Sequence, residues 1–118
     1  LCLVPTVAFA IGETERTCAR IDEPDRAIDA CTQVLERTKP QPLPLKVEAH
    51  NWRGLARRSK GDLDGAIADF DSALKLNPRS AFAFNNRGFT WREKGNPQRA
   101  LSDLDKAIQL KPTYHQAF

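Results

Sequence analysis

The residue types that usually perform catalysis or bind metals are few in this 118-residue sequence and are not grouped in catalytic patterns. The two histidines, His50 and His115, lie far apart, and the sequence has neither an HExxH pattern nor a CxxC pair. The glycines match neither GxGxxG nor GxxxxGK, so we expect no phosphate-binding loop. We therefore expect a protein that is not an enzyme and needs no cofactor or metal.

The charged residues instead recur with a fixed spacing. Two pairs of aspartates lie 34 residues apart, namely Asp69/Asp71 and Asp103/Asp105. Arg53 and Arg87 recur with the same spacing, which favours a structural role. We expect Asp69 to pair with Arg53 and Asp103 with Arg87, since partly buried Arg–carboxylate pairs fix geometry. The sequence leaves open whether these pairs lie within a repeat or between repeats.

An internal repeat extends through two thirds of the chain. When residues 47–80 are set above residues 81–114, identical residues align at Asn51/Asn85, Arg53/Arg87, Gly54/Gly88, Gly61/Gly95, Ala66/Ala100, Asp69/Asp103, Ala73/Ala107, Leu76/Leu110 and Pro78/Pro112. The offset is constant, since 88 − 54 = 34 and 112 − 78 = 34. A 34-residue period in a helical sequence indicates stacked helical hairpins.

Each repeat is predicted to contain two helices. Apolar and small residues recur at helical spacing over 47–60 and 63–76, and again over 81–94 and 97–110. Gly61 and Gly95 are placed to end the first helices, and Asp62 and Asn96 to cap the second ones. We expect large apolar residues to fill the core around the small ones: Phe70, Leu74, Leu76, Phe84, Trp91, Leu101, Leu104 and Ile108.

These positions resemble those of the tetratricopeptide repeat (TPR) family. The signature positions are Gly54/Gly88, Ala66/Ala100, Ala73/Ala107 and Pro78/Pro112, whereas His50, Arg53, Arg57 and Arg87 depart from the usual large residues. The resemblance implies an all-α fold, a right-handed superhelix of helical hairpins. It also implies a concave face, formed by the first helix of each repeat, on which a protein or peptide partner binds.

The expected peptide-binding residues follow from this resemblance. They are Asn51, Leu55 and Arg58 in the first repeat, and Phe82, Asn85, Asn86, Phe89 and Arg92 in the second. Asn side chains can hold a peptide backbone, while apolar residues and arginines add contacts to side chains and carboxylates. Family members that clamp a terminal carboxylate use Lys and Asn on successive first helices. Only Asn86 matches a clamp position, so we do not transfer that activity.

Residues 11–46 are interpreted as a degenerate hairpin followed by a proline-rich link. Ala27, Cys31 and Val34 align with the second-helix positions 66, 70 and 73 at an offset of 39. A first helix is expected over 13–21, without the signature Gly. In the family's hairpin, the positions of Cys18 and Cys31 face each other, which implies a disulfide. The alternatives are two free thiols in a cytosolic protein or, less favoured, a Cys18/Cys31/His50 zinc site.

Residues 1–10, LCLVPTVAFA, are apolar and end in an A-x-A pattern. This is typical of the end of a secretory signal peptide, with cleavage after Ala10 and a mature start at Ile11. Cys2 would then be removed, leaving two cysteines. The alternative is a buried helix or strand. We expect a periplasmic or secreted protein, similar to exported bacterial TPR proteins.

The bulk composition adds only weak constraints. The net charge is +3, and no apolar stretch is long enough to span a membrane. We expect a binding scaffold with no nucleic-acid partner, and self-association through the open repeat end is an option. One alternative is a regulatory or docking arm of a larger enzyme, since residues 115–118 begin a further repeat. A less favoured one is nucleic-acid binding through Arg53, Arg57, Arg58 and Lys60.

Overall fold

Residues 12–111, the part of the chain that the computed structural model describes, contain six helices and no strand. The helices are α2 (Glu13–Cys18), α3 (Pro24–Leu35), α4 (Leu43–Ser59), α5 (Leu63–Leu76), α6 (Ala81–Glu93) and α7 (Pro97–Leu110). The expected signal peptide, the mature start at Ile11, the signature position Pro112 and the further repeat at 115–118 lie outside the described residues.

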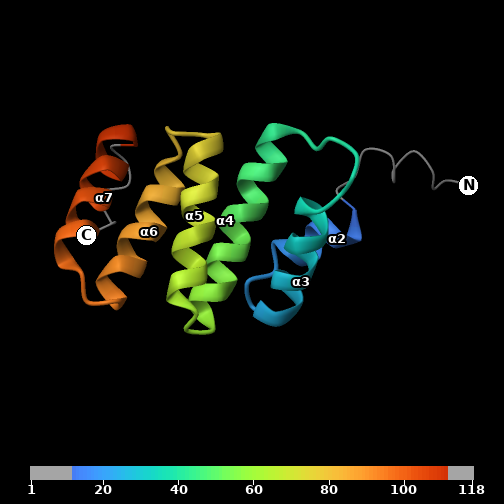
Figure 1. The fold of residues 1–118 in the computed structure, drawn as a ribbon, viewed down its shortest axis with the longest axis horizontal. Helices are drawn as coiled ribbons and strands as arrows, with labels where there is room; N and C mark the ends of the chain where they lie inside the picture. The colour runs from blue at the N-terminus through green and yellow to red at the C-terminus, as the bar shows by residue number, and fades with distance from the viewer. Residues whose placement is uncertain (1–11, 112–118) are drawn as a thin grey trace, which may run out of the picture.

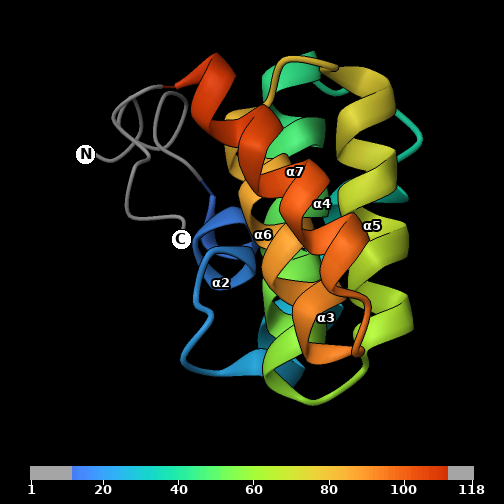
Figure 2. The same cartoon turned by 90° about the vertical axis from the view of Figure 1, so that its left-hand side faces the viewer.

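The helices form three hairpins that stack in chain order (Figure 1). Helix α2 packs on α3, α4 on α5, and α6 on α7, while α3–α4 and α5–α6 contacts join neighbouring hairpins. Figure 2 shows the stack from the end at which α7 lies closest to the viewer. The predicted all-α superhelix of helical hairpins is confirmed.

The turns within the two complete hairpins follow from a few local residues. Gly61 and Gly95 follow the first helices with φ values of 86° and 88°, a left-handed conformation that is strained for any other residue type. The Asp62 carboxylate accepts a hydrogen bond from the Gly65 N–H at 3.0 Å, and Asn96 caps α7 in the same way through the Arg99 N–H. Both predicted caps are therefore present.

Gly54 and Gly88 allow the two helices of the middle and last hairpins to cross closely. A Cβ added at Gly54 would lie 2.7 Å from the Phe70 ring, and one at Gly88 would lie 2.9 Å from Leu104 Cγ. Both distances are shorter than real Cβ contacts, so these positions exclude a side chain unless the neighbouring helix moves.

Three expectations about the helices were wrong in detail. Helix α4 begins at Leu43 and not at residue 47, because Pro44 occupies the first turn, where no N–H is needed for helix bonding. Helix α2 ends at Cys18, before the expected residue 21. Leu101 is 58% exposed and not part of the core, whereas Ile67, its counterpart one repeat earlier, is 8% exposed. Within residues 12–111 no helix follows α7 to cover Leu101.

Candidate functional site

Asp69 forms the centre of a charged cluster inside the middle hairpin. Its buried carboxylate accepts hydrogen bonds from Arg53 Nη2 at 2.7 Å and Arg57 Nη1 at 2.8 Å, and lies 3.3 Å from His50 Nδ1. Burial raises the pKa of Asp69, but the hydrogen bonds from His50 and Arg53 and the charges of both arginines outweigh it, so the pKa lies below the usual value. Asp69 is thus held ionised as a structural group.

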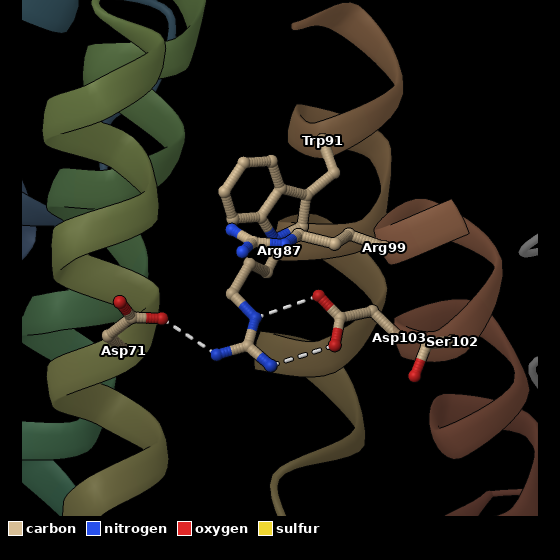
Figure 3. A pocket seen from close by; sticks show the side chains of 6 residues that line it. All are labelled: Asp71, Arg87, Trp91, Arg99, Ser102 and Asp103. Atoms are coloured by element: carbon tan, nitrogen blue, oxygen red, sulfur yellow. Dashed lines mark hydrogen bonds and ion pairs between the residues drawn. The ribbon is translucent and has the colours of Figure 1, made fainter. Parts of the chain in front are cut away.

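In the last hairpin, Arg87 binds Asp103 as Arg53 binds Asp69 in the middle one. Arg87 also binds a carboxylate of the hairpin before it (Figure 3). Its Nε and Nη2 donate to Asp103 at 2.7 and 2.8 Å, while Nη1 donates to Asp71 of α5 at 2.7 Å. Hydrogen bonding to Asp103 raises the pKa of Arg87, against the effect of its burial. The expected Arg53–Asp69 and Arg87–Asp103 pairs are present and lie within one repeat, and Arg87 adds a bond between repeats.

Further polar links between hairpins recur and were missed by the sequence analysis. Arg53 Nη1 donates to Thr32 Oγ1 at 3.0 Å. This bond is the equivalent, one repeat earlier, of the bond from Arg87 to Asp71. On the surface, Lys60 pairs with Asp25 of α3, and Lys94 with Asp64 of α5. The signal was available, because Lys60 and Lys94 lie 34 residues apart and Asp25 and Asp64 share the 39-residue offset.

The first helices α4 and α6 contact each other and present a common face, here called the α4–α6 face. It is defined by residues at helical spacing, namely Glu48, Asn51, Leu55 and Arg58 on α4 and Phe82, Asn85, Phe89 and Arg92 on α6. Residues three and four apart on a helix are neighbours, so each set forms one stripe. The structure therefore brings most of the expected binding residues together on one face.

One end of this face carries arginines around an aromatic ring. The guanidinium carbons of Arg58 and Arg92 lie 5.6 and 5.0 Å from the centre of the Phe89 ring. Arg58 Nε also donates to Glu93 Oε1 at 2.7 Å. Arg92 is exposed and pairs with no carboxylate in the described residues, so its guanidinium is available to an acidic group.

Two of the asparagines in the expected binding set are buried. Asn51, on the α4–α6 face, is 2% exposed, and Asn86, beside this face on α6, is 7% exposed. The reason for Asn86 is local, because its Nδ2 donates to the Phe82 carbonyl oxygen one turn earlier at 2.9 Å. Asn51 and Asn85, at equivalent positions of the two repeats, each have a buried Oδ1 that accepts no hydrogen bond from residues 12–111.

The other end of the face contains a cavity of about 390 Å³. Its walls come from α4, the end of α5, the α5–α6 connection and the start of α6: Leu43, Pro44, Val47, Glu48, Asn51, Leu76, Asn77, Ser80 and Phe82. Leu43 and Phe82, two large apolar residues on its walls, are 51% and 36% exposed. Glu48 is the charged residue of the cavity wall. Sequence reasoning missed the cavity, because it depends on the extra first turn of α4.

The expected disulfide joins Cys18 of α2 to Cys31 of α3, with a Cα–Cα distance of 4.6 Å. Both cysteines are fully buried and form a small cluster with Val34 and Ala49. The bond therefore lies where the first hairpin contacts α4.

Residues 12–111 contain neither a cluster of metal-ligating side chains nor a membrane-spanning helix. No group of three or more His, Cys, Asp or Glu side chains in this range could hold a metal ion. None of the described helices is long and apolar enough to cross a membrane.

The 34-residue hairpins, their glycine-mediated crossings and their stacking in chain order define a helical-repeat protein. Two family models described as Tetratricopeptide repeat match the chain, one over residues 20–81 and the other over residues 81–114. The chain belongs to the tetratricopeptide repeat family.

Solved structures agree with this assignment. YrrB, described as a TPR protein with an unusual peptide-binding site, is 28% identical with a TM-score of 0.72, over 87% of this chain and 50% of YrrB. Two MamA structures match with TM-scores of 0.67 and 0.71 at 24% and 23% identity, over 81% and 85% of this chain and 53% and 55% of theirs. The chain thus spans about half the length of these proteins. No curated protein matches the sequence.

Proposed function

We propose that this protein is a scaffold that binds an extended peptide segment of a protein partner on the α4–α6 face, without chemistry of its own. The observation that carries the proposal is the repeated asparagine position. Asn51 and Asn85 each keep a buried amide oxygen without a partner, which is costly unless a ligand supplies a donor. A peptide backbone offers N–H donors along its length.

Other features of the face support the same function. Helix axes in contact lie about 8–10 Å apart, which is about three residues of extended chain. A peptide crossing from α4 to α6 would therefore bring one backbone N–H to each asparagine in turn. Arg92 adds an exposed guanidinium, which pairs with no carboxylate of residues 12–111, at one end of the face. The TPR neighbour YrrB is described as having a peptide-binding site, which agrees with this use of the fold.

The absence of catalysis is part of the proposal and rests on how the polar residues are used. Asp69, Asp103 and Asp71 are all occupied in bonds to arginines. Asp69 in particular is held ionised between two guanidinium groups, which makes it a poor general acid or base near neutral pH.

The test is binding to an array of immobilised nine-residue peptides of varied sequence. We expect a subset of peptides to bind wild type, and Phe89→Ala and Arg92→Glu to weaken that binding about tenfold, roughly 1.4 kcal/mol. Arg99→Ala is the matched control, because Arg99 also stacks on an aromatic ring, 4.6 Å from the centre of Trp91, but lies between α6 and α7 (Figure 3). Peptide binding that is equally sensitive to all three changes, or to none, would refute the proposal.

We also propose that the protein functions outside the reducing cytosol. The buried Cys18–Cys31 disulfide supports this, because structural disulfides persist mainly in exported proteins. The apolar first ten residues with their A-x-A ending fit the same location. Alkylation of protein isolated from its native host without reduction should label neither cysteine; labelling of both would contradict the proposal.

A further inference from the structure

The two ends of the α4–α6 face differ in chemistry. At the end formed by the carboxyl-terminal turns of α4 and α6, the face carries Arg58 and Arg92 around Phe89. At the opposite end, the cavity of about 390 Å³ is lined by the exposed apolar residues Leu43 and Phe82 and by Glu48. A ligand that crosses the whole face would meet an apolar, acidic end and a basic end.

The cavity end distinguishes the first of the two complete repeats from the second, because it depends on an additional helical turn of α4. Helix α4 starts four residues before the repeat does and contributes Leu43 and Pro44 to the cavity wall. Helix α6 starts directly at its repeat, at Ala81. Leu76 and Ser80 also line the cavity, and the Ser80 hydroxyl is occupied in capping α6 through the Ala83 N–H.

The chemistry of the lining defines what fits. Leu43 and Phe82 remain half exposed and would bury apolar surface against an inserted side chain. Asn51, nine-tenths buried on the same wall, has an amide oxygen without a partner. Glu48 is exposed, and no cation in residues 12–111 pairs with it. These three observations are independent of one another and point to one kind of occupant.

We propose that this cavity is an anchor site for a peptide carrying a large apolar side chain next to a lysine or arginine. The apolar side chain enters between Leu43 and Phe82, the peptide backbone donates to the Asn51 amide, and the basic neighbour pairs with Glu48. This inference rests on the proposed function, of which it defines the peptide class.

The opposite end adds a second requirement at a defined spacing. Phe82 and Arg92 are ten residues apart on α6, which corresponds to about 15 Å along the helix axis. An extended peptide covers that distance in four to five residues. The preferred ligand therefore has its apolar–basic pair at one end and an acidic residue four to five positions away.

The test uses synthetic, fluorescently labelled nine-residue peptides of serine and glycine that contain these groups. The reference peptide carries Leu next to Lys, and Glu five positions from Leu; the comparison peptides replace Leu by Ser, Lys by Glu, or the distant Glu by Lys. Both orientations of the sequence are made. Binding is measured by fluorescence anisotropy, and we expect each replacement to weaken binding of wild type about five- to tenfold.

Protein variants assign each effect to a residue. Glu48→Lys should reverse the preference, so that the Glu-neighbour peptide binds better than the Lys-neighbour one. Leu43→Ser should remove the preference for Leu over Ser, and because Leu43 is exposed the fold should persist. Thermal unfolding followed by circular dichroism checks that both variants are folded as wild type is.

The outcomes separate this inference from the proposed function. If peptides bind and respond to Arg92→Glu but not to Glu48→Lys or Leu43→Ser, the anchor site is wrong and peptide binding on the face stands. If no peptide binds to wild type, or if no variant of either end changes binding, both the anchor site and the proposed function are wrong.

Discussion

At the crossing of its two helices, the middle hairpin places Gly54 against Phe70, whereas the first hairpin has Glu15 and Cys31 at these positions. The equivalence follows from the 39-residue offset, since 54 − 15 = 39 and 70 − 31 = 39. A small residue on the second helix leaves room for a Cβ on the first one. The first hairpin therefore reverses the usual distribution of small and large residues.

The two hairpins also differ in how they are held closed. The middle hairpin has the Arg53–Asp69 pair, but the first has Thr14 and Ala30 at those positions and cannot form it. In its place the first hairpin has the Cys18–Cys31 disulfide and a partly buried Glu15–Arg37 ion pair. The hydrogen bond from Arg37 lowers the pKa of Glu15. A six-residue α2 without a charged core pair is thus stabilised by a covalent bond.

The largest expected effect tests the difference at the crossing. Gly88→Leu forces a side chain into Leu104 and into the backbone of Ala100, 3.1 Å from the added Cβ. We expect a loss of more than about 3 kcal/mol and unfolding of the α6–α7 hairpin, measured by chemical denaturation. Glu15→Leu, which places the same side chain at the equivalent position of the first hairpin, is the control and should cost much less, because that crossing already holds a side chain there. Equal losses would mean that the two crossings are not built differently.

Removal of the disulfide should have the next largest effect, confined to the first hairpin. The Cys18→Ser/Cys31→Ser variant removes the bond between two cysteines that are 13 residues apart in the sequence. In the chain-entropy model, the loss of this closed loop lowers the free energy of unfolding by about 3 kcal/mol. Amide hydrogen exchange should show faster exchange in α2 and α3 and unchanged protection in α6 and α7. Uniformly faster exchange in all three hairpins would show that the disulfide stabilises the whole array instead.

The charged core of the middle hairpin should make its stability sensitive to acid. The pKa of folded Asp69 lies below its usual value of 3.8, so its contribution is complete above that value and is lost as the pH falls through the folded pKa. Asp69→Asn should cost about 2 kcal/mol at pH 7 and progressively less below pH 4. Denaturation curves of both proteins between pH 2 and 7 measure this. A difference that is constant with pH would contradict the assignment.

The surface links between hairpins should contribute least. Lys94 and Asp64 are exposed, so Lys94→Ala should cost less than about 1 kcal/mol, and the difference should vanish in 1 M NaCl. Lys60→Ala, which breaks the equivalent link to the first hairpin, should behave alike if both links are only surface contacts. A larger loss for Lys60 would show that the first hairpin depends more on its neighbour.

The sequence predicted those features that depend on local rules or on the repeat. Positive-φ glycines, helix caps and the partners of Arg53 and Arg87 follow from residue type at a recurring position. The bond from Arg87 to Asp71 required knowledge of how hairpins stack, which the sequence left open. The exposure of Leu101 and the burial of Asn51 depend on which neighbour covers each position, and a periodic pattern does not contain that information.

Arg87 belongs to two hairpins at once, and this has a consequence for how such an array can lengthen. A duplicated copy of residues 81–114 placed after the original would bring its own arginine opposite Asp105, the counterpart of Asp71 one repeat later. The new unit would thus arrive with its charged partner already in place. A copy inserted directly after the first hairpin would instead meet the neutral Thr32. Growth by duplication is therefore electrostatically easier at the carboxyl-terminal side of the repeats.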